Sequence, residues 1–279
     1  MSSLKQRLFT TLLGIPLLLI VIFLLPQFEH LAFAIVVTVF TLLGSKEIYK
    51  IIKIKFNINP NLPYFFCGII PIASWLSTFT GISNLTELTL ILLLIISFTI
   101  EIFSGSKSET PFSDSISTIA LDSFALIYPG YLLSFIIKVN AFDEVSKFYA
   151  LFLLTVFSND IFAYIFGMLL GKNSRGFIKA SPNKSVVGFI GGILSSIIIC
   201  CATWFILNIP LNIIEILIIG LALSLTANIG DLIESVIKRS ANVKDAGKII
   251  PGRGGALDNL DSLMVCAPLF FLLLEIFLK

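Results

Sequence analysis

The segment from Ser235 to Asp261, SVIKRSANVKDAGKIIPGRGGALDNLD, combines cations, carboxylates and a glycine-rich turn and is the most polar stretch of the chain. Glycine turns can offer backbone N–H groups to phosphate oxygens. The cations that could neutralise phosphate charge are Lys238, Arg239, Lys244 and Arg253. The carboxylates that could hold a divalent cation are Asp231, Asp245, Asp258 and Asp261. This combination indicates phosphoryl or nucleotidyl transfer.

A second polar region, residues 158–192, contains a carboxylate inside an apolar run. A charge at that depth is costly unless it faces a polar cavity or a partner, so we expect Asp160 to be functional. Tyr164, Gly167 and Gly171 follow Asp160 at helical spacing. The two glycines by themselves are interpreted as packing residues that let another helix approach closely.

Polar residues also enter the apolar run before the glycine-rich segment. They recur in steps of four and three, which places them along one face of a helix. They are Ser224, Asn228, Asp231, Ser235 and Lys238. Such a stripe needs a polar cleft to face.

Histidine and cysteine are scarce. His30 is the only histidine, so a multi-histidine metal site or a catalytic histidine–aspartate pair is not expected within one chain. The four cysteines lie in apolar runs without CxxC spacing, and neither a disulfide framework nor a zinc site is expected. The chemistry is therefore expected to use carboxylates, lysine, arginine and a hydroxyl.

Membrane helices must position these residues. Of the 279 residues, 57% are hydrophobic and 13% are charged, and the mean hydropathy is +1.00. A soluble chain is nearer to about 45–50% apolar and about 25% charged. The excess apolar surface must face lipid, which excludes a water-soluble single domain. The net charge of +2 gives no electrostatic case for nucleic acid binding.

Nine apolar segments are candidate spans and predict an all-α, polytopic integral membrane protein with about nine transmembrane helices and a polar active-site cleft on the cytoplasmic side. They are residues 8–25, 31–43 with an amphipathic extension to 54, 64–79, 88–103, 116–137, 148–170, 186–206, 213–237 and 263–278. About five of these helices form a predicted N-terminal region, 1–140. The rest form a catalytic region, 141–279, with the loop 235–262.

The positions of the cations predict the orientation. Alternate loops between nine spans form two sets, and one set holds all of the 19 Lys and Arg residues except Lys138, Lys147 and Lys279. Because cytoplasmic loops carry the excess of Lys and Arg, we expect the N-terminus and the active site in the cytoplasm and the C-terminus outside. The compartment is expected to be a bacterial-type inner or plasma membrane.

The polar segment resembles the signature of the phosphatidate cytidylyltransferases, or CDP-diacylglycerol synthases, which reads S-x-x-K-R-x4-K-D-x-(small)-x2-(apolar)-P-G-H-G-G-x2-D-R-x-D. The matching positions are Ser235, Lys238, Arg239, Lys244, Asp245, Gly247, Ile250, Pro251, Gly252, Gly254, Gly255, Asp258 and Asp261. Upstream, Asp160, Ala163, Tyr164 and Gly167 look like the D-x-x-A-Y-x-x-G element of the family, and SPNKS before GFIGG is similar to its S-P-K-K-T-x-E-G-x-x-G-G segment. The resemblance covers residues 158–262.

The chain departs from the family pattern at three positions. Arg253 stands where the family usually has His, Asn259 stands where it usually has Arg, and Val187 replaces the usual Glu. The charged core of the signature is retained. The departures bear on the role of the glycine turn.

The resemblance implies that CTP and phosphatidic acid react to CDP-diacylglycerol and pyrophosphate at the bilayer, with Mg²⁺ and with a second monovalent or divalent cation left open. The implied catalytic residues are Asp231, Lys238, Arg239, Lys244, Asp245, Asp258 and Asp261, of which Asp231, Asp258 and Asp261 bind the metal. The implied substrate-binding residues are Asp160, Ser181, Lys184, Ser235, Gly252, Arg253, Gly254 and Gly255. A homodimer is also left open.

Two alternatives remain from the residues themselves. Another membrane nucleotidyl or phosphoryl transferase acting on a lipid would show similar phosphate and metal recognition. An ion-coupled transporter would use the polar stripe as an ion path, but it predicts polar residues spread across the membrane rather than gathered at one side.

Overall fold

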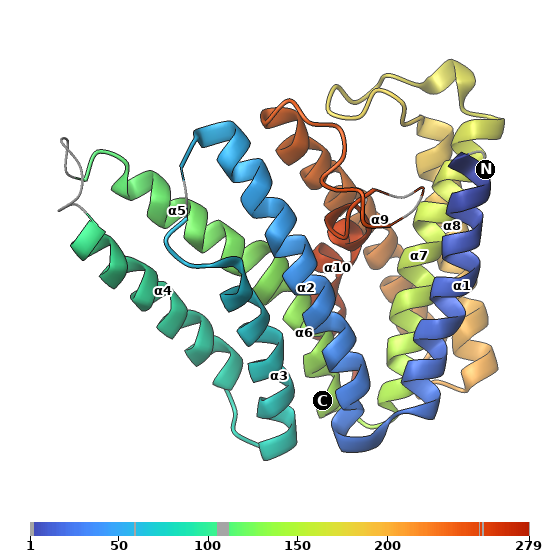
Figure 1. The fold of residues 1–279 in the computed structure, drawn as a ribbon. Helices are drawn as coiled ribbons and strands as arrows, with labels where there is room; N and C mark the ends of the chain where they lie inside the picture. Colours follow the sequence, from blue (N-terminus) through green and yellow to red (C-terminus); the bar gives the residue numbers. More distant parts are fainter. Residues whose placement is uncertain (1–2, 59, 105–111, 251, 253, 279) are drawn as a thin grey trace.

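The computed structural model is a bundle of helices (Figure 1). It describes residues 3–58, 60–104, 112–250, 252 and 254–278. The α-helices are α1 (Ser3–Leu24), α2 (Gln27–Phe56), α3 (Ile69–Thr80), α4 (Leu85–Ser104), α5 (Ser115–Ala125), α6 (Leu132–Lys138), α7 (Val145–Leu169), α8 (Val186–Leu207), α9 (Ile213–Ser240) and α10 (Leu257–Leu278). The short helical turns are η1 (Tyr64–Gly68), η3 (Leu126–Tyr131), η4 (Val139–Ala141) and η5 (Lys172–Ser174). The described ranges contain no β-strand.

Every one of the nine predicted spans is helical. The third corresponds to η1 and α3, and the fifth to α5, η3 and α6. Within the described ranges, seven helical segments are long and apolar enough to cross a membrane, and Leu13–Leu24 and Tyr64–Thr80 are shorter apolar helices. The chain is therefore an all-α, polytopic integral membrane protein, and the count of nine spans stays a prediction.

Helix α7 packs against α1, α8, α9 and α10, and every side chain from Phe148 to Phe152 is buried. Outer helices instead expose large apolar side chains, including Phe103 of α4 and Phe205 of α8. These exposed side chains would face lipid in a membrane.

The connections gather at two opposite ends of the bundle. In Figure 1 the N-terminus, the connection between α7 and α8, and the connection between α9 and α10 lie at the upper end. The C-terminus lies at the lower end. The two loop regions that were predicted to carry chemistry therefore share one end of the molecule.

The loop after α9 folds back along the helix before α10 begins. A Cβ built at Gly230 of α9 would lie 2.5 Å from the carbonyl oxygen of Asp261. The first turns of α10 therefore pack directly against α9 at Gly230. Glycine allows this close approach. The first turn of α10 therefore lies next to the predicted polar stripe.

Candidate active site

Lys238 lies between two carboxylates at the α9–α10 contact. Its ammonium pairs with Glu234, one turn earlier on α9, and with Oδ1 of Asp258 on α10 at 2.5 Å. The side chains of Glu234 and Asp258 are only 1% and 8% exposed. The ammonium thus holds together two carboxylates that would otherwise repel each other in a buried place.

Asp258 also organises the loop before it. Its Oδ2 accepts hydrogen bonds from the N–H groups of Ala246 at 3.1 Å and Gly255 at 2.7 Å. Gly254 has a φ of +93°, and a Cβ there would lie 2.5 Å from the same oxygen. Both facts favour glycine at this position. In this structure Asp258, which was predicted to bind metal, accepts hydrogen bonds from the loop and pairs with Lys238.

The glycine-rich turn closes on itself. The N–H of Ile250 donates to the carbonyl of Gly254 at 2.8 Å, and the N–H of Gly254 donates back at 3.1 Å. Gly252 has a φ of +78°. The N–H groups of Gly254 and Gly255 are therefore engaged within the loop. The predicted substrate residue Arg253 lies outside the described residues.

A second group of carboxylates surrounds the start of α10. Asp261 is 6% exposed, and the charges of Asp160, Asp231 and Glu234 all act on it. The Ser262 hydroxyl donates to Oδ1 of Asp160 at 3.3 Å. Asp160 on α7 is thereby brought to the signature segment, as the sequence predicted.

The connection before α8 reaches the same place. Lys184 pairs with Asp231 of α9. Arg239 donates from Nε to the carbonyl of Ala180 at 3.4 Å, although its side chain is exposed. Ser181 lies in the turn that ends at Lys184, whose N–H donates to the carbonyl of Ser181 at 3.1 Å. The two polar regions of the sequence thus form one site.

The remaining predicted residues lie around this site with different exposures. Ser235 is buried on α9, whereas Lys244 and Asp245 are exposed on the loop. Gly167 and Gly171 pack against the start of α8, where a Cβ at Gly171 would lie 2.1 Å from the Ser185 hydroxyl oxygen. These two glycines are packing residues, as expected.

The polar stripe of α9 faces α7. The side-chain amide of Asn228 donates to Oδ1 of Asn159 at 3.4 Å and to the carbonyl of Ser224 at 2.9 Å. Ser224 is fully buried. The stripe is thus partnered by a polar side chain of α7 at this level, while its later residues Asp231 and Lys238 belong to the charged site.

Glu47 of α2 is a residue of this region that the sequence reasoning missed. It is 1% exposed, and its Oε2 accepts the N–H of Leu257, the first residue of α10, at 2.8 Å. A Cβ at Gly247 or Gly255 would lie 2.0 or 2.3 Å from the Glu47 carboxylate. Glu47 therefore fills the space that these glycines leave. A carboxylate inside an apolar helix, the criterion applied to Asp160, was the signal that could have identified it.

Tyr128 is a second residue that was missed. It is 4% exposed and lies in η3, a π-helical turn that contains Pro129. Its hydroxyl has no hydrogen-bond partner among the described residues, and the charges of Asp231, Glu234 and Asp261 act on it. Short π-helical turns often occur at functional sites. Tyr128 adds an unsatisfied polar group to the carboxylate group around α10.

Glu47→Ala is expected to lower the free energy of unfolding by about 1–3 kcal/mol, because the buried N–H of Leu257 loses its acceptor. Glu47→Gln keeps an acceptor oxygen and should lose less. Thermal unfolding of the purified protein in detergent measures both. Lys46→Ala, at the exposed neighbouring position, is the matched control. Equal stability of Glu47→Ala and Lys46→Ala would contradict this role of Glu47.

The chemistry of these side chains fits a magnesium ion. The donors are carboxylates, which Mg²⁺ prefers, and Asp160, Asp231 and Glu234 are each close enough to Asp261 for their charges to act on it. The unsatisfied Tyr128 hydroxyl lies beside them. In the described part of the chain, no three His, Cys, Asp or Glu side chains are arranged so that they alone could hold a metal ion. Mg²⁺ commonly uses one or two carboxylates and completes its shell with water and substrate phosphates.

The chain is similar to known proteins over nearly its whole length. A model described as the cytidylyltransferase family matches residues 5–277. The chain is 32% identical over 281 residues to a phosphatidate cytidylyltransferase of Bacillus subtilis (strain 168), which covers 99% of this chain and 100% of that protein. It is 34% identical over 237 residues to a phosphatidate cytidylyltransferase of Staphylococcus haemolyticus (strain JCSC1435), with 84% and 86% covered. The predicted resemblance is confirmed and extends to the N-terminal helices.

Proposed function

This chain belongs to the cytidylyltransferase family, and from that membership we propose that it transfers CMP from CTP to phosphatidic acid, giving CDP-diacylglycerol and pyrophosphate in a membrane. In the reaction a phosphate oxygen of phosphatidate bonds to the α-phosphorus of CTP. The bond from that phosphorus to pyrophosphate breaks, and pyrophosphate leaves. The comparisons do not favour the transporter or a different lipid transferase.

One observation carries the proposal beyond the family match. Cations and carboxylates from three segments far apart in the sequence meet at one end of the bundle: Asp160 of α7, Lys184 before α8, and the α9–α10 segment. Two anionic substrates repel each other, so positioning by cations is the main requirement of the reaction. This site supplies such cations where a lipid phosphate at the membrane surface and a soluble nucleotide can both arrive.

The residues divide into two roles in this proposal. Lys184, Lys238 and Arg239 bind phosphate oxygens, with the exposed Lys244 and Asp245 at the entrance for CTP. Asp231 and Asp261, with Asp160 beside them, would hold Mg²⁺. When bound, Mg²⁺ would offset the negative charge of the reacting phosphates. Asp258 and Glu47 keep the loop in place. Because the attacking phosphate is already anionic, no histidine base is needed.

The direct test uses the purified full chain in detergent with labelled CTP, phosphatidate and Mg²⁺. We expect a labelled CDP-lipid and one pyrophosphate for each lipid formed. ATP or GTP in place of CTP should give little product. No CDP-lipid under conditions in which the protein stays folded would overturn the proposal.

We propose that the end of the bundle with the site faces the cytoplasm and that the C-terminus lies outside. The gathering of the two polar connections at one end supports this orientation. In a cysteine-free background, a cysteine at Ser174 or Asn242 should react with an impermeant thiol reagent only from the cytoplasmic side, and one at Ser83 or Asn208 only from outside. Labelling of Asn242→Cys from outside would reverse both the orientation and the entry route of CTP.

A further inference from the structure

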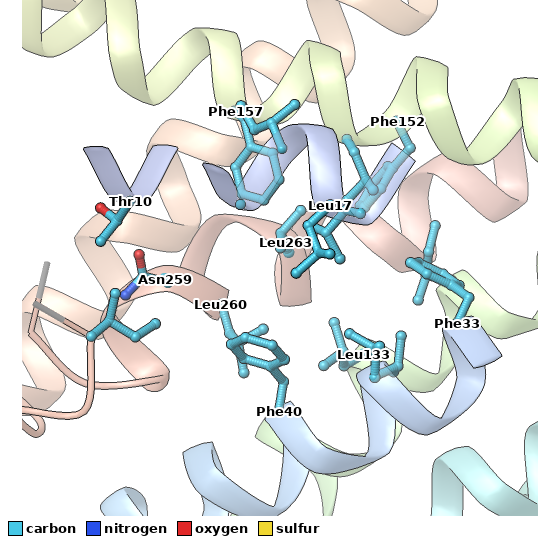
Figure 2. A pocket seen from close by; sticks show the side chains of 18 of the residues that line it. Thr10, Leu17, Phe33, Phe40, Leu133, Phe152, Phe157, Asn259, Leu260 and Leu263 are labelled. Atoms are coloured by element: carbon cyan, nitrogen blue, oxygen red, sulfur yellow. The ribbon is translucent and has the colours of Figure 1, made fainter. Parts of the chain in front are cut away.

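An apolar cavity of about 420 Å³ lies between α1, α2, α6, α7 and the start of α10 (Figure 2). Among the described residues that line it, only Thr10 and Asn259 are polar. A cavity of about 150 Å³ can hold a benzene molecule. This cavity is therefore large enough for a long stretch of hydrocarbon, and its walls offer the dispersion contacts that hydrocarbon requires.

The cavity has a polar end and an apolar end. Figure 2 shows Thr10 and Asn259 at one side, and Phe33 and Leu133 at the other. Asn259 donates from its side-chain amide to the carbonyl of Gly255 at 2.7 Å, in the glycine-rich loop. Ile250, which closes the glycine turn with Gly254, also lines the cavity. The polar end is thus continuous with the loop that carries the site.

We propose that this cavity binds one acyl chain of the phosphatidate substrate, with the glycerol end beside Asn259 and the chain end near Phe33 and Leu133. The proposal rests on the proposed function and deepens it by naming a binding site for the lipid part of the substrate. A phosphate held at the charged site leaves its acyl chains directed away from the loop. The cavity is the apolar space that begins at this loop.

Helix α1 forms the outer wall of the cavity. Leu13 and Leu17 line the cavity and are also 54% and 62% exposed, so the wall at these residues is one helix thick. Helix α1 packs mainly against α2 and α7. An acyl chain that moves from the bilayer into the cavity therefore has to pass only α1.

Gly14 on this wall controls the room for the chain. It lines the cavity, and a Cβ built there would meet no atom within 4 Å. It follows Thr10 by four residues, which places it about 6 Å deeper along the helix axis. A large side chain at Gly14 can therefore occupy the cavity without displacing neighbouring atoms at its base.

The experiment compares Gly14→Phe with wild type on two phosphatidates, one with 18-carbon and one with four-carbon acyl chains. Because a single methylene in an apolar pocket can change discrimination about 10- to 200-fold, kcat/KM for the long-chain lipid should fall at least about ten-fold. The value for the short-chain lipid should stay within about two-fold. An equal change for both lipids, or no change for either, overturns the proposal.

Two further variants keep this result interpretable. Ile20→Phe adds the same side chain to α1 at a position that is 49% exposed and outside the cavity, and should leave both activities unchanged. Leu133→Phe reduces the cavity from the α6 side and should reproduce the selective loss. If Gly14→Phe does not fold, as judged by thermal unfolding, the result for Leu133→Phe decides.

A binding measurement separates this proposal from the proposed function. A phosphatidate with a diazirine midway along one acyl chain should crosslink to cavity residues of wild type and not of Gly14→Phe. Crosslinking without any CDP-lipid would retain the cavity site and remove the proposed reaction. CDP-lipid formation with crosslinking that Gly14→Phe leaves unchanged would do the reverse. Equal labelling by a phosphatidylcholine probe would show a bilayer lipid and overturn the substrate assignment.

Discussion

Lys238→Met is expected to lower the free energy of unfolding by about 3–5 kcal/mol and CDP-lipid formation by about two orders of magnitude or more. Methionine keeps most of the side-chain volume but leaves Glu234 and Asp258 facing each other with the ammonium gone. Two uncompensated carboxylates at 1% and 8% exposure are costly. Thermal unfolding and the CTP assay measure the two effects separately.

A double variant separates the structural from the catalytic role of Lys238. Lys238→Met with Glu234→Gln removes one of the two carboxylate charges, so stability should be regained in part. Activity should stay low, because the phosphate-binding cation is still absent. Lys248→Met, on an exposed part of the loop that follows α9, is the control and should change neither quantity greatly. Recovery of activity in the double variant would show that Lys238 acts only through stability.

Asp261→Asn should lower turnover at limiting Mg²⁺ by about two orders of magnitude or more, since the carboxylate charge that favours a divalent cation is lost while the shape is kept. The melting temperature should not fall, because Asp160, Asp231 and Glu234 would repel one carboxylate fewer. The measurement is turnover against Mg²⁺ concentration.

The control for Asp261→Asn is Asp143→Asn, which changes an exposed carboxylate in the connection between η4 and α7. It should keep wild-type turnover at every Mg²⁺ concentration. Wild-type turnover of Asp261→Asn at limiting Mg²⁺ would exclude Asp261 from the metal site. A large fall in its melting temperature would instead indicate a structural role for the carboxylate.

Much of the fold could be predicted because lipid imposes one rule on every segment. A backbone surrounded by hydrocarbon must satisfy its own hydrogen bonds, so each long apolar run becomes a helix, as all nine runs do. The same rule identified Asp160, since a carboxylate in such a run needs a polar neighbour. The family match confirms the function to which the signature pointed.

The internal pairing of the site could not be predicted in the same way. Glu47 and Leu257 are 210 residues apart, and no local pattern connects them. Nor does spacing reveal that Asp258 accepts hydrogen bonds from Lys238, Ala246 and Gly255 and thereby holds the loop. Tyr128 was missed because it lies in a π-helical turn, and the sequence pattern did not predict that this turn places it near the carboxylates. These features arise from how the helices pack.

The hydrogen bond from Leu257 to Glu47 has a consequence for biosynthesis. A ribosome delivers α2 to the membrane long before α10, so the carboxylate of Glu47 does not accept this hydrogen bond until α10 is inserted. Contacts between such distant segments form late in folding because a long loop must be closed first. A nascent chain that is released early, or truncated before α10, would therefore carry most of the membrane helices and no assembled catalytic loop. Activity of this protein thus reports that α10 has been inserted.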